Sequence, residues 1–253
     1  MITFQLAGVE VPRVGLGTNR LTTAPEHVAF IREAVAAGLR HIDTAHVYTG
    51  GESERAIGEA LEGVVEDVLV ATKGGYGDVG QGKPEVLEAQ IEQSLRSLRT
   101  DSIGLYYLHR VDPETPLEQS LGAIKAHVDR GAIRHVGISA VSVEQIERAR
   151  QVVPIAAVQN HYNLAEREHD DVVDHCDREG IAFVPYYPLH GSAPGVADAA
   201  ERLGVTENTV KLAWLLRRSP VVAPIPGTLS IEHLRENLAA PELDLGDADD
   251  IAA

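Results

Sequence analysis

The stretch His41-Ile-Asp-Thr-Ala-His-Val-Tyr48 decides how the rest of the chain is interpreted. A helical pattern ends at a glycine just before it, residues 39–43 form a short apolar run, and residues 44–52 are rich in small residues and glycine. We therefore predict that Asp43 ends a buried strand and that Tyr48 lies in the following loop. If that strand belongs to a parallel barrel, both residues lie at the edge where such folds place their chemistry.

The composition limits the class of protein. The chain has 253 residues, close to the roughly 250 of one parallel barrel, so we expect residues 1–253 to form a single domain. A net charge of −16 disfavours nucleic acid and anionic membranes as partners. The start of the chain lacks a signal-peptide pattern, and no apolar run is long enough to span a membrane. With a single cysteine, Cys176, an intramolecular disulfide is excluded, and we expect a cytoplasmic protein.

Short apolar runs alternate with amphipathic segments along the chain. We predict eight strands, at residues 14–18, 40–43, 68–72, 103–109, 135–139, 157–159, 182–186 and 222–226. Helices are predicted at residues 25–37, 84–98, 117–130, 142–152, 168–179 and 206–217, with a loop and short helix over 191–203. Repeated strand–helix units predict a parallel sheet of the α/β class, and eight units at this length predict a (β/α)8 TIM barrel.

Both ends of the chain carry further signals. Residues 2–13 alternate polar and apolar side chains around Ala7-Gly8, which predicts a short N-terminal β-hairpin. Residues 243–253 have room for about one helical turn, so we expect a truncated C-terminal tail rather than a loop folded over the barrel mouth.

Polar side chains end most of the predicted strands. They are Thr18, Asp43, Lys73, His109, Ser139 and Gln159. Because burying an unpaired charge is costly, Lys73 and Asp43 are expected to pair or to take part in chemistry. Two other interpretations exist for these residues: a metal site at His41, Asp43 and His46, or a Schiff-base lysine at Lys73. Since Lys73 is expected beside Asp43, we predict no metal site.

These motifs together resemble the aldo-keto reductase family. The resemblance rests on Asp43 in HIDTA, Tyr48, Lys73 in ATKGG and His109 in LYYLHR. It extends over roughly residues 11–243 through Gly15-Leu-Gly-Thr18, Gly137-Ile-Ser139, Val158-Gln-Asn160, Tyr186-Tyr-Pro-Leu189, and Ile225-Pro-Gly-Thr228 with Arg235-Glu-Asn237. It implies a TIM barrel, commonly monomeric, that uses NADPH to reduce an aldehyde or ketone to an alcohol. The wording over 159–164 and 225–238 is closest to the bacterial branch that includes pyridoxal reductases, so pyridoxal is one candidate small-molecule substrate and a bulky ketone is another.

The resemblance assigns four residues to catalysis, and their chemistry suits the task. Tyr48 would donate a proton to the carbonyl oxygen, although the pKa of a free tyrosine is about 10. Lys73 would lower that pKa, and Asp43 would hold Lys73 in place. His109 would orient the carbonyl and stabilise the charge that develops on its oxygen.

The resemblance also implies the residues that contact NADPH or NADP+. Ser139 and Gln159 would hold the nicotinamide carboxamide, Tyr186 would stack on its ring, and Thr18 would contact the ribose. The pyrophosphate and adenosine would meet Pro188, Leu189, Gly227, Thr228, Ser230, Arg235 (at the 2′-phosphate) and Asn237, and the same set includes Gly17, Tyr187 and Ile225. The amides at the start of the last helix suit a phosphate.

Three departures from the family pattern leave specificity open. Ala140 follows Ser139 where the family usually has asparagine, Tyr187 replaces a usual serine, and the long C-terminal loop is absent. Two alternatives to a reductase stay open. One is a Schiff-base lyase that uses Lys73, and the other, favoured by Ala140 and Tyr187, is an NADPH-binding regulatory or redox-sensing module with little turnover.

Overall fold

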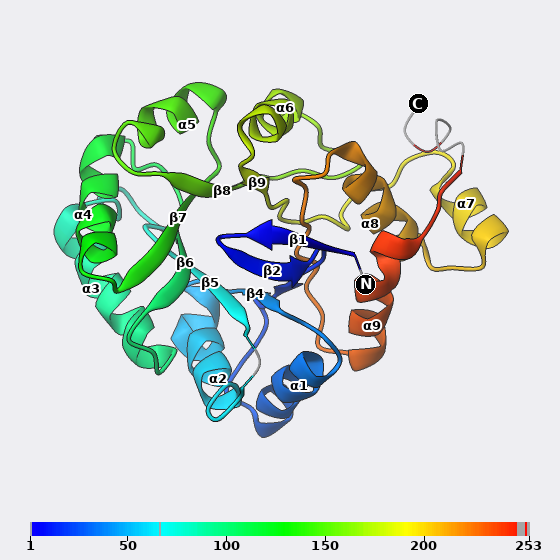
Figure 1. Ribbon diagram of the computed structural model, residues 1–253, viewed down its shortest axis with the longest axis horizontal. Coiled ribbons are helices and arrows are strands. Elements are labelled where there is room, and N and C mark those ends of the chain that lie inside the picture. The colour runs from blue at the N-terminus through cyan, green and yellow to red at the C-terminus, as the bar shows by residue number, and fades with distance from the viewer. Residues whose placement is uncertain (1, 66, 247–250, 252–253) are drawn as a thin grey trace.

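A curled parallel sheet organises the chain, shown in Figure 1 as a computed structural model that describes residues 2–65, 67–246 and 251. Its seven strands neighbour one another in chain order, and every ladder is parallel. They are β3 (Leu16–Gly17), β4 (His41–Asp43), β5 (Leu69–Gly74), β6 (Ile103–Leu108), β7 (Ile133–Ser139), β8 (Ile155–Gln159) and β9 (Ala182–Phe183). The predicted strands at these seven places are confirmed.

The eighth predicted strand, residues 222–226, forms no regular ladder but still joins the two edges of the sheet. Its contacts are the bridges Phe183↔Val222 and Gly17↔Gly227, with hydrogen bonds from Ala223 N–H to Phe183 O, Gly15 N–H to Pro224 O and Gly17 N–H to Pro226 O. Pro224 and Pro226 have no N–H, so they accept from Gly15 and Gly17 but cannot donate in return. The (β/α)8 architecture is therefore present, with its last strand reduced by proline.

Helices surround the sheet on its outer side (Figure 1). They are α1 (Pro25–Ala36), α2 (Glu52–Ala60), α3 (Pro84–Ser97), α4 (Leu117–Asp129), α5 (Val143–Arg150), α6 (Asp170–Glu179), α7 (Val196–Leu203), α8 (Glu207–Arg218) and α9 (Ile231–Ala239). Two 3-10 turns, η1 (Tyr48–Gly51) and η2 (Ala240–Glu242), precede α2 and follow α9. Among the described residues, no helix is both long and apolar enough to cross a membrane.

Helix α2 follows the predicted loop directly and was not predicted. Its buried face consists mainly of small residues, with Ile57 the one large aliphatic side chain there. A Cβ at Gly58 would lie 2.4 Å from the carbonyl oxygen of Ser97, so α2 and the end of α3 approach each other at backbone distance. Such close packing needs small residues, which weaken the hydrophobic periodicity that predicts a helix.

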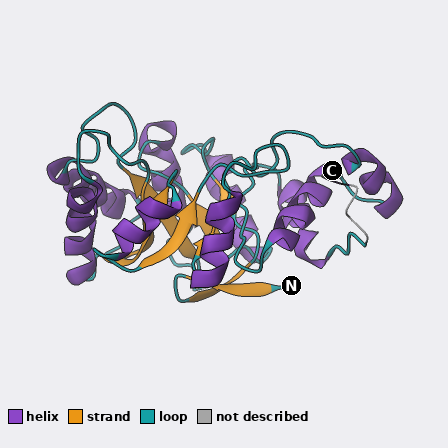
Figure 2. Cartoon of the chain, turned by 90° about the horizontal axis from the view of Figure 1, so that it is seen from above, coloured by secondary structure: helices purple, strands orange, loops and turns teal. Residues whose placement is uncertain are grey.

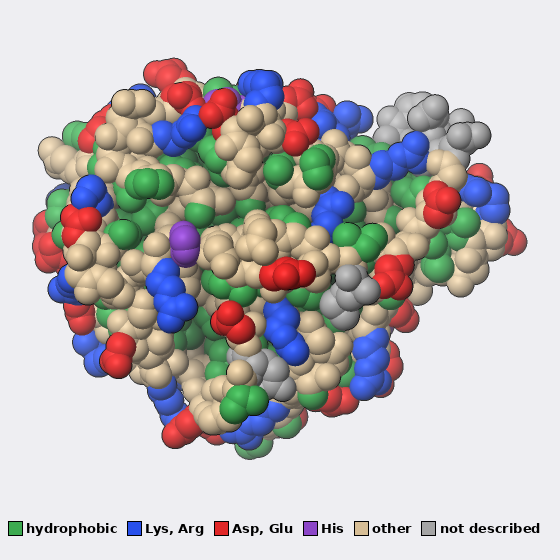
Figure 3. Space-filling model, in the orientation of Figure 1, with side chains coloured by type: hydrophobic (Ala, Val, Ile, Leu, Met, Phe, Trp, Pro, Cys, Tyr) green, Lys and Arg blue, Asp and Glu red, His purple; other side chains and the backbone are tan. Residues whose placement is uncertain are grey.

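The predicted hairpin is confirmed as β1 (Thr3–Leu6) and β2 (Val9–Pro12). Its turn places Ala7 at φ 49° and Gly8 at φ 74°, the left-handed values of a type I′ turn. Buried Leu6 and Val11 pack in one cluster with inward-facing strand residues such as Tyr107. Figure 2 shows the hairpin at one end of the strands, and Figure 3 shows that it covers the centre of this face. A cavity of about 590 Å³ lies beside the hairpin turn, next to α2 and the starts of β5 and β6. The open end of the barrel is therefore the opposite one, which holds the carboxyl ends of the strands.

Residues 247–250, 252 and 253, which carry most of the expected C-terminal turn, lie outside the described residues.

Candidate active site

The segment after β4 brings the Tyr48 side chain back toward the strand ends. Thr49, Gly50 and Gly51 have φ values of 48°, 64° and 84°, a left-handed run that two glycines make accessible. The Thr49 hydroxyl stabilises this turn, because it donates to Leu21 O at 2.6 Å and accepts from Ser53 N–H at 3.1 Å. The turn then leads directly into α2.

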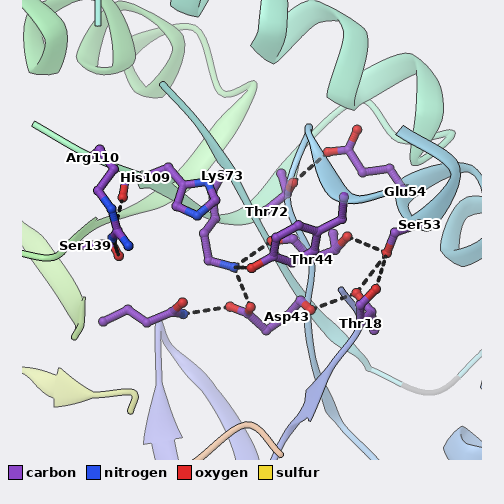
Figure 4. Close-up of polar contacts among 12 residues, drawn as sticks. Thr18, Asp43, Thr44, Ser53, Glu54, Thr72, Lys73, His109, Arg110 and Ser139 are labelled. Atoms are coloured by element: carbon purple, nitrogen blue, oxygen red, sulfur yellow. Dashed lines mark hydrogen bonds and ion pairs between the residues drawn. The ribbon is translucent and has the colours of Figure 1, made fainter. Parts of the chain in front are cut away.

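Lys73 lies at the centre of the site, fully buried at the carboxyl end of β5 (Figure 4). Its ammonium group forms an ion pair with Asp43 and donates to Thr44 O at 2.8 Å and to the Tyr48 hydroxyl at 3.5 Å. The second carboxylate oxygen of Asp43 accepts from Gln159 Nε2 at 2.8 Å. Three strand ends and the η1 turn thus converge on one buried charge pair.

The charge state of this group follows from burial and pairing. Burial opposes the charge of Lys73, but Asp43 and Tyr48 outweigh it and raise the lysine pKa. For Tyr48, burial is the largest effect and raises the pKa, while the neighbouring Lys73 ammonium lowers it. The expected lowering of the Tyr48 pKa by Lys73 is therefore present, but in the free site the loss of hydration is larger and the net pKa is raised. Tyr48 is a neutral phenol beside a permanent cation.

His109 follows β6 and faces the same group. Its ring centroid lies 6.1 Å from that of Tyr48, with the rings at 81°. Burial, reinforced by the positive charges of Lys73 and Arg110, lowers the His109 pKa to about 2. The imidazole is therefore neutral at any physiological pH, and it can take part in hydrogen bonds without bringing a charge.

A cavity of about 510 Å³ opens above these residues. Most of the predicted cofactor contacts line it together with three of the four predicted catalytic residues; the lining includes Gly17, Thr18, Asp43, Tyr48, His109, Ser139, Gln159, Tyr186, Tyr187, Pro188, Leu189, Ile225 and Gly227. Lys73 is absent from this lining because it lies beneath Asp43 and Tyr48. The structure thus brings these separately predicted residues to one surface.

A second cavity of about 430 Å³ adjoins the first at the start of α9. Arg20, Leu189 and Gly227 line both cavities, and the second also contains predicted residues Thr228, Ser230 and Asn237. The Ser230 hydroxyl accepts from His233 N–H at 3.3 Å and so caps the helix. A helix N-terminus and an arginine therefore face one space.

Arg235 lies outside the lining of this second cavity. Its side chain is 61% exposed, and its Nη2 atom lies 3.6 Å from a carboxylate oxygen of Glu33 on α1. Exposed ion pairs of this kind contribute little energy, so the side chain is free to take other rotamers.

Sequence reasoning missed two arginines that line the site, Arg20 and Arg110. Each follows a predicted strand-end residue closely: Arg20 comes two residues after Thr18, and Arg110 directly follows His109. This proximity was the available signal, but the direction of each side chain depends on its tertiary neighbours.

The two residues that depart from the family pattern share a backbone feature. Ala140 has φ 55° and Tyr187 has φ 53°, both left-handed. Asparagine adopts this conformation more readily than alanine, so the residue usual in the family would fit the backbone at position 140 better.

Comparison with known proteins defines the class. Residues 13–195 match the model of the Aldo/keto reductase family, and the chain belongs to that family. It is 36% identical to pyridoxine 4-dehydrogenase of Escherichia coli, over 97% of this chain and 94% of the relative. An uncharacterised oxidoreductase of Schizosaccharomyces pombe is also 36% identical, over 96% of this chain and 86% of the relative.

Solved structures agree with this assignment. A thermostable aldo-keto reductase in complex with the inhibitor epalrestat superposes with a TM-score of 0.89 at 32% identity, covering 98% of this chain and 97% of that one. An aldo/keto reductase from Klebsiella pneumoniae in complex with NADP and acetate gives 0.85 at 28% identity, covering 99% and 93%. The predicted (β/α)8 fold is thereby confirmed.

Proposed function

We propose that this protein reduces an aldehyde or ketone to the alcohol with NADPH, using Tyr48 as the proton donor. The observation that carries the proposal is the geometry beneath the cavity: a neutral phenol, a buried ammonium 3.5 Å from its oxygen, and a neutral imidazole on the same surface. Family membership supports the reaction class.

The two adjoining cavities suit a dinucleotide phosphate. The first offers the Tyr186 ring and the polar side chains of Ser139 and Gln159, which fit a nicotinamide ring and its amide. The second offers the N-terminus of α9 and the Arg20 side chain, which suit phosphate groups. The K. pneumoniae structure that superposes on this chain was crystallised with NADP, which supports the same cofactor here.

The geometry supports a role for each of these residues. Bound in these cavities, NADPH would supply the hydride for the carbonyl carbon. Tyr48 donates its proton to the carbonyl oxygen, and Lys73 stabilises the phenolate that remains. Asp43 and the Thr44 carbonyl hold the Lys73 ammonium in place. The neutral His109 ring is placed to hydrogen-bond the carbonyl oxygen as negative charge develops.

Arg235 is proposed for the 2′-phosphate. To reach the second cavity it would leave Glu33, which costs little because the pair is exposed. Asn237 is proposed for the adenine side, since it already lines that cavity.

The raised pKa of Lys73 argues against the Schiff-base lyase. A lysine that attacks a carbonyl must be unprotonated, and here Asp43 and Tyr48 stabilise the ammonium form. Trapping a substrate on Lys73 with borohydride, without NADPH oxidation, would reverse this conclusion. Steady NADPH turnover would count against the regulatory module.

A panel of carbonyl compounds monitored by NADPH absorbance tests the proposal. Pyridoxal belongs in the panel because the E. coli relative is a pyridoxine 4-dehydrogenase, and bulky ketones belong there as the competing class. We expect Tyr48→Phe to lower kcat by at least about 100-fold, the lower range for loss of an acid catalyst, while NADPH affinity changes little. Retained turnover with lost NADPH binding would contradict the assignment.

We also propose that residues 1–253 form one domain, which acts as a cytoplasmic monomer on a small molecule without nucleic acid or membrane. Size-exclusion chromatography with light scattering tests the monomer, and a particle mass near 54 kDa, about twice the 27.2 kDa chain, would contradict it.

A further inference from the structure

Arg110 is fixed beside the candidate site by contacts on several sides. Its Nη1 atom donates to His109 O and to Ser139 Oγ, each at 3.2 Å (Figure 4). Its Nη2 atom donates to the Tyr186 hydroxyl at 3.2 Å. Its guanidinium carbon lies 5.8 Å from the ring centroid of Tyr76 and 5.5 Å from that of Tyr186. The cation thus lies within cation–π distance of two aromatic rings and lines the cavity with His109.

The charge of Arg110 lacks an anionic partner in the described part of the chain. No carboxylate lies within 4.0 Å of its nitrogens there, and Asp43, the one acidic residue that lines the cavity, is engaged by Lys73 and Gln159. A guanidinium group has five N–H donors. The three hydrogen bonds above account for three of them, so Nε–H and one Nη2–H have no acceptor among the described residues.

A structural role alone does not require this charge. The three acceptors of Arg110 are neutral oxygens, and two of them belong to hydroxyls, so none of them requires a cationic donor. A guanidinium that loses hydration without a counter-ion is costly. The phosphates of the proposed cofactor are assigned to the other cavity, at Arg20 and α9, away from His109. A net charge of −16 would otherwise repel anions from this protein.

We propose that Arg110 binds a carboxylate of the substrate, so that this protein prefers carbonyl compounds bearing an acidic group near the reacting carbon. The proposal rests on the reductase function proposed above and specifies its substrate class. A guanidinium edge with two free N–H donors matches a carboxylate in a bidentate hydrogen-bonded pair. Held by Arg110, such a substrate would present its carbonyl oxygen to His109 and Tyr48.

Matched substrates test this selectivity. The three positional isomers of carboxybenzaldehyde and their methyl esters differ in charge but little in shape, and the isomers vary the distance from the carbonyl to the acid. We expect kcat/KM of the full-length enzyme with NADPH to favour the acid over its ester for at least one isomer. Arg110→Gln should lower that acid-to-ester ratio by about 10- to 100-fold, the range spanned by charge-assisted hydrogen bonds.

Control variants separate specific binding from general effects. Arg148→Gln removes the same charge from an exposed pair with Glu118 and should leave the ratio unchanged. Arg110→Lys keeps the charge but loses the planar edge, so an intermediate ratio is expected. Arg20→Gln removes the other arginine that lines the cavity. If Arg20→Gln rather than Arg110→Gln abolishes the preference, the proposal is overturned.

Other outcomes distinguish the remaining roles. A fall in both acid and ester turnover with a constant ratio would make Arg110 a support for Ser139 and Tyr186. A loss limited to NADPH affinity would assign Arg110 to the cofactor. Either result overturns the proposal. Benzoate binding measured by calorimetry requires no turnover, so it tests Arg110 separately. Weaker benzoate binding in Arg110→Gln than in the wild type supports the anion site, and equal binding overturns it. If no aldehyde is reduced while this difference in benzoate binding persists, only the proposed reductase function is refuted.

Discussion

Removing the carboxylate of Asp43 should destabilise this protein through the charge left on Lys73. In Asp43→Ala, the ammonium keeps Thr44 O and the Tyr48 hydroxyl as partners but loses its counter-ion while remaining fully buried. Breaking a buried pair by removing one partner costs about 3–5 kcal/mol. For a chain of this size we expect the melting temperature to fall by roughly 6–20 °C.

The pH dependence identifies the cause. In the wild type the Lys73 pKa is raised above its ordinary 10.5, so its stabilising contribution is complete below pH 10.5 and is lost as pH rises through the folded value. In Asp43→Ala, burial acts without the carboxylate and lowers the pKa. Between that lowered pKa and pH 10.5, Lys73 is protonated in the unfolded variant but deprotonated in the folded one. The loss of unfolding free energy caused by Asp43→Ala should therefore become smaller as pH rises.

Urea unfolding at pH 7 and pH 9.5, followed by circular dichroism, measures both effects. The double variant Asp43→Ala, Lys73→Met removes the charge as well as its partner and should recover part of the loss at pH 7. A penalty that is equal at both pH values and is not reduced in the double variant would refute the electrostatic explanation.

Three further predictions concern packing, protonation and cofactor choice. Gly17→Ala places a Cβ 2.7 Å from Ile225 O and should lower the unfolding free energy by about 1–3 kcal/mol. The control Gly122→Ala in α4 meets no atom within 4 Å and should be neutral or stabilising. Equal effects of the two variants in urea unfolding would contradict the close contact between Gly17 and Ile225. Because its pKa is about 2, His109 should produce no step in the kcat/KM profile between pH 5 and pH 8, and a step that disappears in His109→Gln would disprove its neutrality. Arg235→Ala should raise the Kd of NADPH by at least about tenfold, because one charge-assisted contact to the 2′-phosphate is lost, and should leave the Kd of NADH nearly unchanged. An equal rise in both Kd values would place the 2′-phosphate elsewhere.

The strand ends show why much of the site was predictable. Asp43 and Lys73 each end a short apolar run, and in a parallel barrel the carboxyl ends of all strands meet at one face. A local pattern therefore predicted a long-range encounter, which the ion pair between these residues confirms. The hairpin was predictable for a simpler reason, because Ala7-Gly8 between alternating residues suits a tight turn.

Other features depended on how separate segments meet. Residues 222–226 were predicted as a full strand, yet Pro224 and Pro226 restrict them to bridges between β9 and β3. Helix α2 has a buried face of small residues, which allows its close approach to the end of α3. The sequence of α2 alone does not indicate that α3 will lie so close to it.

The sequence by itself determined the barrel and the set of residues that reach its open face, because strand periodicity and strand ends are local properties. Only the tertiary structure decided the electrostatics of that face. Burial, which depends on every surrounding element, raises the Tyr48 pKa despite Lys73 and leaves His109 neutral. The tertiary structure also directs Arg110, one residue past a predicted strand end, into the cavity, because its side chain donates to Ser139 and Tyr186 from distant parts of the chain.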